Sequence, residues 1–156
     1  MDNSHIAALG GLVLEASDTL NEATVHVAAD KIIEVLRLLK SRGFNRLSAV
    51  SGVDWHPQEP RFELVYNLHA LPLKGGKQER IRVKCRVSGA SPEIASAVPV
   101  WEGAGWYERE IFDLLGVTFT GHPDMRRLLM PEGWVGHPLR KDFPIHGHKY
   151  DYAENK

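Results

Sequence analysis

The pattern of apolar and polar residues predicts regular secondary structure through most of the first 87 residues. Segment 32–39 places its apolar residues on one helical stripe, so we predict a helix that Asp30 caps and Gly43 ends. Apolar runs rich in β-branched and aromatic residues predict strands at about 24–27, 45–54, 61–69 and 79–87. This part of the chain therefore combines at least one helix with several strands.

Segment 79–87 alternates most strictly. Every second residue is basic and the residues between them are apolar, so a strand here has one basic and one apolar face: Arg80, Arg82, Lys84 and Arg86 against Ile81, Val83, Cys85 and Val87. Segment 61–69 alternates likewise, and the pair predicts an antiparallel hairpin with one buried face. We expect an α+β fold, a two-layer sandwich in which helices back a mixed, mostly antiparallel sheet. The basic face either docks an acidic partner or is simply solvated.

A second helix is predicted at 106–115, with Gly116 as its C-cap and four ionisable residues: Glu108, Arg109, Glu110 and Asp113. An enzyme would use Glu108 and Glu110 as an acid/base pair. Residues two apart lie nearly opposite each other on a helix, whereas Arg109 and Asp113, four apart, can form an ion pair. A structural or interfacial ion-pair network is the favoured interpretation.

The segment 121–144 is punctuated by four prolines, at positions 123, 131, 138 and 144, which favour an extended chain over a helix or a central strand. It mixes Met, aromatic and Leu side chains with arginines, a composition typical of protein interfaces. It either docks on a partner or covers its own domain. We expect a core domain at 1–120 and a C-terminal docking strap with a polar tail at 121–156, together forming one structural unit.

Composition narrows the possible partners. The 156 residues include 19 basic and 20 acidic ones, a net charge of −1, which argues against nucleic acid or an anionic membrane as a direct partner. Cys85 is the single cysteine and excludes a cluster held only by cysteines of this chain. His146 and His148 leave a metal-binding accessory protein open, although histidine spacing disfavours a native site. No membrane span or export signal is evident, so the expected compartment is the cytoplasm.

Three sequence blocks carry a resemblance to a known family: YEREIFDLLGVTF at 107–119, GHPDMRRLL at 121–129 and GHPLRKDFP at 136–144. They resemble the signature of the thirty-kilodalton subunit, or C subunit, of NADH:quinone oxidoreductase (respiratory complex I). The resemblance implies a cofactor-free structural subunit of the peripheral arm, placed against the D and B subunits on the cytoplasmic face of the bacterial inner membrane. FMN and iron–sulfur clusters would lie in other subunits, where NADH is oxidised and quinone reduced. The isolated chain would be inactive.

The resemblance also implies roles for particular residues. Four would organise the helix and its junction with the strap: Glu108, Arg109, Glu110 and Asp113. Others would dock on neighbouring subunits: His122, Pro123, Arg126, Arg127, His137, Pro138, Leu139, Arg140, Lys141, Asp142 and Phe143. Two alternatives stay open, namely the equivalent subunit of a membrane-bound hydrogenase or other quinone-reductase complex, and a small independent acid/base enzyme.

Overall fold

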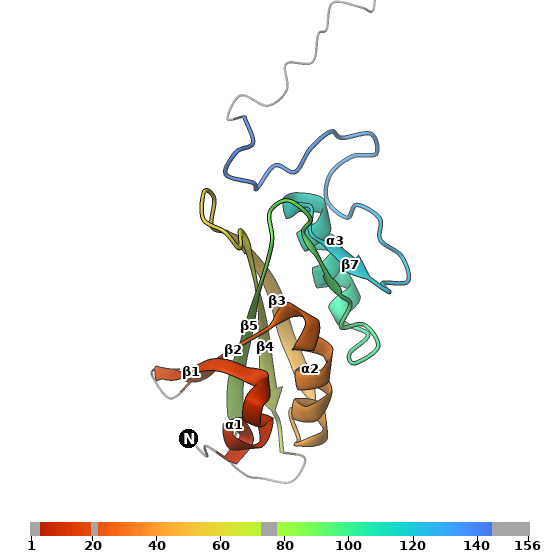
Figure 1. Ribbon diagram of the computed structural model, residues 1–156. Coiled ribbons are helices and arrows are strands. Elements are labelled where there is room, and N and C mark those ends of the chain that lie inside the picture. The colour runs from red at the N-terminus through yellow and green to blue at the C-terminus, as the bar shows by residue number, and fades with distance from the viewer. Residues whose placement is uncertain (1–3, 20–21, 73–77, 145–156) are drawn as a thin grey trace, which may run out of the picture.

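The computed structural model describes residues 4–19, 22–72 and 78–144 (Figure 1). Its main sheet has five strands in the order β1-β2-β5-β4-β3. They are β1 (Val13–Thr19), β2 (Glu22–Val27), β3 (Arg46–Asp54), β4 (Phe62–Ala70) and β5 (Glu79–Val87). Strands β2 and β5 run parallel and the other neighbours antiparallel, which confirms the predicted mixed, mostly antiparallel sheet.

The β4–β5 hairpin has the predicted two faces. Leu64 lies opposite Cys85 and Tyr66 opposite Val83, and all four are buried. On the other face three of the four basic residues of β5 contact acidic neighbours, because Arg82 contacts Glu22 and both Lys84 and Arg86 contact Glu63. Much of the positive charge of this face is therefore already balanced within the domain.

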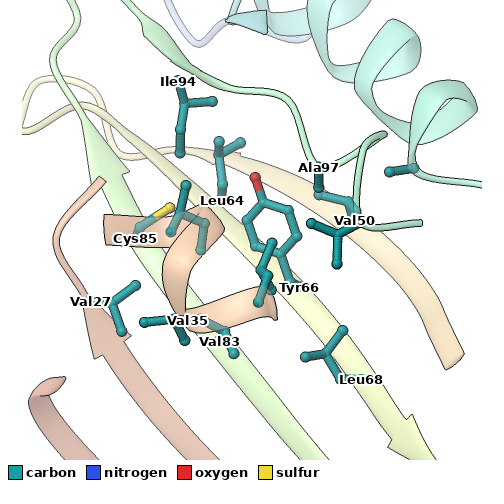
Figure 2. Packing of buried hydrophobic residues seen from close by; sticks show 14 of the residues in the cluster. Val27, Val35, Val50, Leu64, Tyr66, Leu68, Val83, Cys85, Ile94 and Ala97 are labelled. Atoms are coloured by element: carbon teal, nitrogen blue, oxygen red, sulfur yellow. The ribbon is translucent and has the colours of Figure 1, made fainter. Parts of the chain in front are cut away.

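Helix α2 (Ile32–Ser41) covers the apolar face of the sheet with the predicted stripe, of which Val35, Leu36 and Leu39 are fully buried. Figure 2 shows Val35 beside the β4 and β5 residues of this core. The helix ends where predicted, since Gly43 has φ of 99°. The predicted Asp30 cap is wrong, because Asp30 lies inside a 3-10 turn, η2 (Ala29–Lys31), that continues directly into α2.

Helix α3 (Ala104–Leu115) packs on the same face of the sheet as α2. Gly52 of β3 lies opposite Leu64, and a Cβ added to it would come within 2.5 Å of the Leu115 side chain. A glycine at this position therefore lets α3 approach β3 closely. The helix ends at Gly116, the predicted C-cap, which has φ of 73°.

The short elements were not predicted from the sequence pattern. These are α1 (Ser4–Leu9), η1 (Gly10–Leu12), strand β1 and the small parallel pair β6 (Glu93–Ala95) and β7 (Thr118–Thr120). Six residues or fewer show no reliable period, and β1 carries few apolar residues because it is an exposed edge strand. No helix in the described part of the chain is long and apolar enough to cross a membrane.

The strap, residues 121–144, contains no helix or strand, as its prolines predict. It leaves β7, passes the C-terminal end of α3 and reaches the loop between β3 and β4 (Figure 1). The division into a core domain and a strap at residue 120 stays a prediction. Residues 145–156, with His146 and His148, lie outside the described residues.

Candidate protein–protein interface

Asp113 of α3 holds the first part of the strap. Its side chain is fully buried, and one carboxylate oxygen accepts hydrogen bonds from the backbone N–H groups of Leu128, Leu129 and Met130 at 2.9, 2.7 and 2.8 Å. The other oxygen accepts one from the Arg127 guanidinium at 2.7 Å. Burial raises the pKa of Asp113, but these donors together outweigh it and leave the pKa below its ordinary value. The carboxylate is therefore charged and serves as an anchor.

The predicted ion pair between Arg109 and Asp113 is wrong. Arg109 instead donates to the backbone carbonyls of Arg126 and Arg127, each at 3.0 Å. Helical spacing brings the two side chains to one face, yet each forms its hydrogen bonds with the strap instead of with the other. Both residues thus bind the strap, Arg109 through its carbonyls and Asp113 through its N–H groups and Arg127.

The second part of the strap covers the C-terminus of α3. The Arg140 guanidinium donates to the carbonyl of Leu115 at 2.6 Å, and the backbone N–H of Leu139 donates to that of Leu114 at 3.0 Å. His137 uses Nδ1 to donate to the Asp113 carbonyl at 3.0 Å. Carbonyls in the last turn have no partner inside the helix, so the strap takes the place of water there. A cation at a helix C-terminus also interacts favourably with the helix dipole.

Arg61, just before β4, fastens the end of the strap, and the sequence pattern did not point to it. Its guanidinium forms paired hydrogen bonds of 2.7–2.8 Å with both Asp54 and Asp142. Asp54 also accepts the backbone N–H of Lys141 at 2.8 Å. The hydrogen bonds from Arg61 are the main reason that the pKa values of both carboxyls are lowered. Only a weak signal was available, because, of these residues, only Asp142 and Lys141 lie in a signature block, the one at 136–144.

The two glutamates of α3 occupy different environments. Glu108 is fully buried and accepts hydrogen bonds of 2.6 Å from the Ser96 hydroxyl and the Ala97 N–H, while burial raises its pKa. Glu110 is exposed. Their positions confirm that they do not face each other, and Glu108 instead fixes the loop after β6.

His122 connects the start of the strap to the beginning of α3. Its Nδ1 accepts the N–H of Asp124 at 3.0 Å, so Nε2 carries the proton that is donated to the Gly105 carbonyl at 3.1 Å. Asp124 in turn binds Arg126 through two hydrogen bonds of 2.6 and 2.8 Å on the surface. Among the described residues no group of three or more His, Cys, Asp or Glu side chains could hold a metal ion.

The strap turns the half-buried guanidinium groups of Arg127 and Arg140 toward α3 and leaves three large apolar side chains exposed. Leu129, Val135 and Leu139 are 60%, 68% and 61% exposed. Pro123, Lys141 and Asp142 are also exposed, whereas Pro138 and Phe143 are half-buried. The strap therefore covers its own domain and still offers an apolar outer surface. That these residues dock on neighbouring subunits stays a prediction.

The fold and this junction define a class of protein, an α+β domain whose buried charges hold an extended apolar strap on its surface. The particular family follows from comparison, because the model for the respiratory-chain NADH dehydrogenase 30 Kd subunit matches residues 25–149. The chain belongs to this family, which confirms the resemblance carried by the three sequence blocks.

Similar proteins support the assignment. The C subunit of NADH-quinone oxidoreductase from Geobacter sulfurreducens is 45% identical over 137 residues, covering 86% of this chain and 82% of the relative. Its counterpart from Roseiflexus castenholzii is 40% identical over 153 residues, covering 96% and 86%. Among solved structures, a trypsin-resistant fragment of Nqo5 is 33% identical with a TM-score of 0.65, covering 70% of this chain and 88% of the fragment.

A chain from the membrane-bound sulfane sulfur reductase, an archaeal respiratory membrane complex, also has this fold. It is 27% identical with a TM-score of 0.71, and the match covers 91% of this chain and 83% of the archaeal one. The fold thus occurs in respiratory complexes with different chemistry.

Proposed function

We propose that this chain is a structural subunit of the peripheral arm of a proton-translocating NADH:quinone oxidoreductase. It holds no cofactor itself and fixes its neighbours, chiefly the D and B subunits, in the positions that electron transfer from NADH to quinone requires. FMN and the iron–sulfur clusters belong to other subunits. The chain is attached to the cytoplasmic face of the bacterial inner membrane through the complex.

One observation carries this proposal. Asp113, Arg127 and Arg140 hold the strap in place, and three large apolar side chains of the strap remain exposed: Leu129, Val135 and Leu139. An exposed apolar surface on a rigid support is what a docking site needs, since little conformational entropy is lost on binding. Relatives named as this subunit of NADH-quinone oxidoreductase support the identity of the complex.

The environment of the glutamates argues against the alternative of an independent acid/base enzyme. Glu108 is fully buried beneath the loop after β6, so a substrate cannot reach it. Glu110 lies on the surface, and Asp113 is surrounded by donors from this chain. A general acid and base must both reach the same substrate.

Charge introduced into the outer surface of the strap tests the proposal. Leu129→Asp and Val135→Asp should prevent assembly into the membrane complex, because each places a charge in an apolar interface. Leu14→Asp is the matched control, since Leu14 is 72% exposed but lies on β1, away from the strap. All three variants should fold, because none of the replaced side chains is buried.

Assembly is measured by recovering the tagged chain from detergent-solubilised native membranes and assaying NADH oxidation and the bound subunits. Loss of partners in the two strap variants, with normal recovery for the Leu14 control, supports the proposal. Normal assembly of both strap variants refutes it. Partners that reduce quinone or protons without NADH would favour the related-complex alternative.

A further inference from the structure

Strand β3 is an edge of the main sheet, and a groove of about 250 Å³ runs along it. One wall consists of four consecutive β3 residues, 49–52, and the other of residues from α3 and the strap. Side chains of consecutive strand residues point to opposite faces, so four in a row line this groove through backbone as well as side-chain atoms of the edge strand.

The register shows which backbone groups of β3 face the groove. Trp55 N–H donates to the Arg61 carbonyl at 2.8 Å, so residues 55 and 61 form a hydrogen-bonded pair of the antiparallel ladder. Such pairs alternate along the ladder, and Ser51 opposite Val65 is therefore also hydrogen-bonded. Val50 and Gly52 lie between these pairs and direct their N–H and C=O groups away from β4. They present a row of donors and acceptors to the groove.

The far wall of the groove is apolar except for one charged residue. Ile111, Leu114 and Leu115 of α3 line it together with the exposed Leu139 of the strap, whose backbone is fixed by its hydrogen bond to Leu114. Glu110 is the single acidic or basic residue in the lining. It makes no hydrogen bond or ion pair with any residue in the described part of the chain.

The chain occupies a backbone carbonyl at one end of this edge, and no strand of the described residues pairs with the rest. The Tyr107 hydroxyl donates to the Ser48 carbonyl at 2.8 Å. Ser48 directly precedes the four β3 residues that line the groove, so its carbonyl is not available to a further strand. Natural proteins cover or charge edge strands that are not meant to pair. Residues 49–52 carry no charged side chain of their own, and within the described residues no strand pairs with this edge.

We propose that an extended apolar segment of a neighbouring subunit, with one Lys or Arg, binds in this groove as an additional strand beside β3. Its backbone pairs with Val50 and Gly52, its apolar side chains contact Leu114 and Leu139, and its basic residue pairs with Glu110. Strand addition of this kind derives affinity from main-chain hydrogen bonds and specificity from alternate side chains. The inference rests on the proposed function, because it requires a partner from the complex.

Amide hydrogen exchange provides the direct test. In the assembled complex the N–H groups of Val50 and Gly52 should exchange at least about tenfold more slowly than in the isolated chain. The Ser51 N–H is the internal control, because it already pairs with β4 in both states. Equal exchange of Val50 and Gly52 in the two states overturns the inference.

A photo-crosslinking amino acid identifies the occupant and separates this inference from the proposed function. It is placed at Ser51 beside the groove, at Val135 on the strap and at Ala16 on the opposite sheet edge as control. The inference is supported if Ser51 crosslinks to a segment of a neighbouring subunit that is apolar and contains a Lys or Arg. If only Val135 crosslinks to a neighbouring subunit, strand addition in the groove is refuted but the docking function of the strap is not. If neither Ser51 nor Val135 crosslinks, both proposals are refuted.

Glu110 variants test the charge. Glu110→Arg should weaken assembly strongly and Glu110→Gln only slightly, and reversing the charge of the crosslinked basic residue should restore assembly of Glu110→Arg. A Ser51 crosslink to a second copy of this chain or to its own residues 145–156 would show that the occupant is wrong. Equal assembly of the Arg and Gln variants would show that no basic residue binds there.

Discussion

Replacing Asp113 with Asn should release the strap from α3 while leaving the core domain folded. The Asp113 carboxylate accepts three backbone N–H groups and the Arg127 guanidinium in a buried position. Asn retains one oxygen for the three amides but turns its own N–H₂ group toward Arg127, so two donors face each other. The change therefore breaks a buried ion pair without altering the size of the side chain.

The magnitude follows from the burial of the pair. Removing one partner of a buried ion pair costs roughly 3 to 5 kcal/mol. The Arg127 side chain is 23% exposed and can regain some water, which favours the lower figure, about 3 kcal/mol. Since every 1.4 kcal/mol is a factor of ten, the strap should open about a hundredfold more often.

Amide exchange of Leu128, Leu129 and Met130 measures this opening, and their rates should rise about a hundredfold in the Asp113→Asn variant. Asp124→Asn is the matched control, because Asp124 also binds an arginine of the strap but on the exposed surface. Surface pairs contribute little, so that variant should exchange nearly as the original does. Unchanged rates in Asp113→Asn, or equal changes in both variants, would refute the anchoring role of Asp113.

The same anchor should depend on pH. Because the folded-state pKa of Asp113 is lowered, its contribution is complete above the pKa of the unfolded chain and is lost as the pH falls through the folded-state value. Exchange of the three strap amides, corrected for the intrinsic effect of pH, should therefore accelerate on acidification. The Asp113→Asn variant should lack this dependence.

Three further changes test other parts of the structure. Arg61→Met leaves the buried Asp54 without its cation and should lower the free energy of unfolding by roughly 3 to 5 kcal/mol, measured by urea denaturation. Arg126→Met, which breaks an exposed pair, is the control, and an equal or greater loss of stability in that variant would contradict the prediction. Gly116→Ala places a Cβ at φ of 73°, against Arg140 and His137, and should cost at least about 1 to 2 kcal/mol in the same assay; an unchanged midpoint would disprove this. Burial raises the pKa of Glu108, so the original protein should lose stability as the pH rises from the unfolded-state pKa of this group to its folded-state pKa. Glu108→Gln should remove that loss. If the plots of Tm against pH for the original protein and for Glu108→Gln are parallel, this argument is refuted.

The sequence by itself determined the elements with a clear period and the family. The apolar stripe of α2, the alternation of β4 and β5 and the α3 pattern with its C-cap glycine each follow from contacts within one element or between neighbours in the chain. The three signature blocks indicated the family, and the match over residues 25–149 confirmed it. The short elements α1, β6 and β7 were missed because six residues or fewer carry too little of a period.

Only the tertiary structure decided which charged groups meet. Asp113 binds groups that lie 14 to 17 residues further along the chain, Arg61 binds Asp142 across 81 residues, and Arg109 turns to carbonyls rather than to Asp113. Local spacing shows which side chains share a face of a helix but not which distant backbone will cross that face. The path of the strap, and with it the open edge of β3, depends on packing between residues far apart in the sequence.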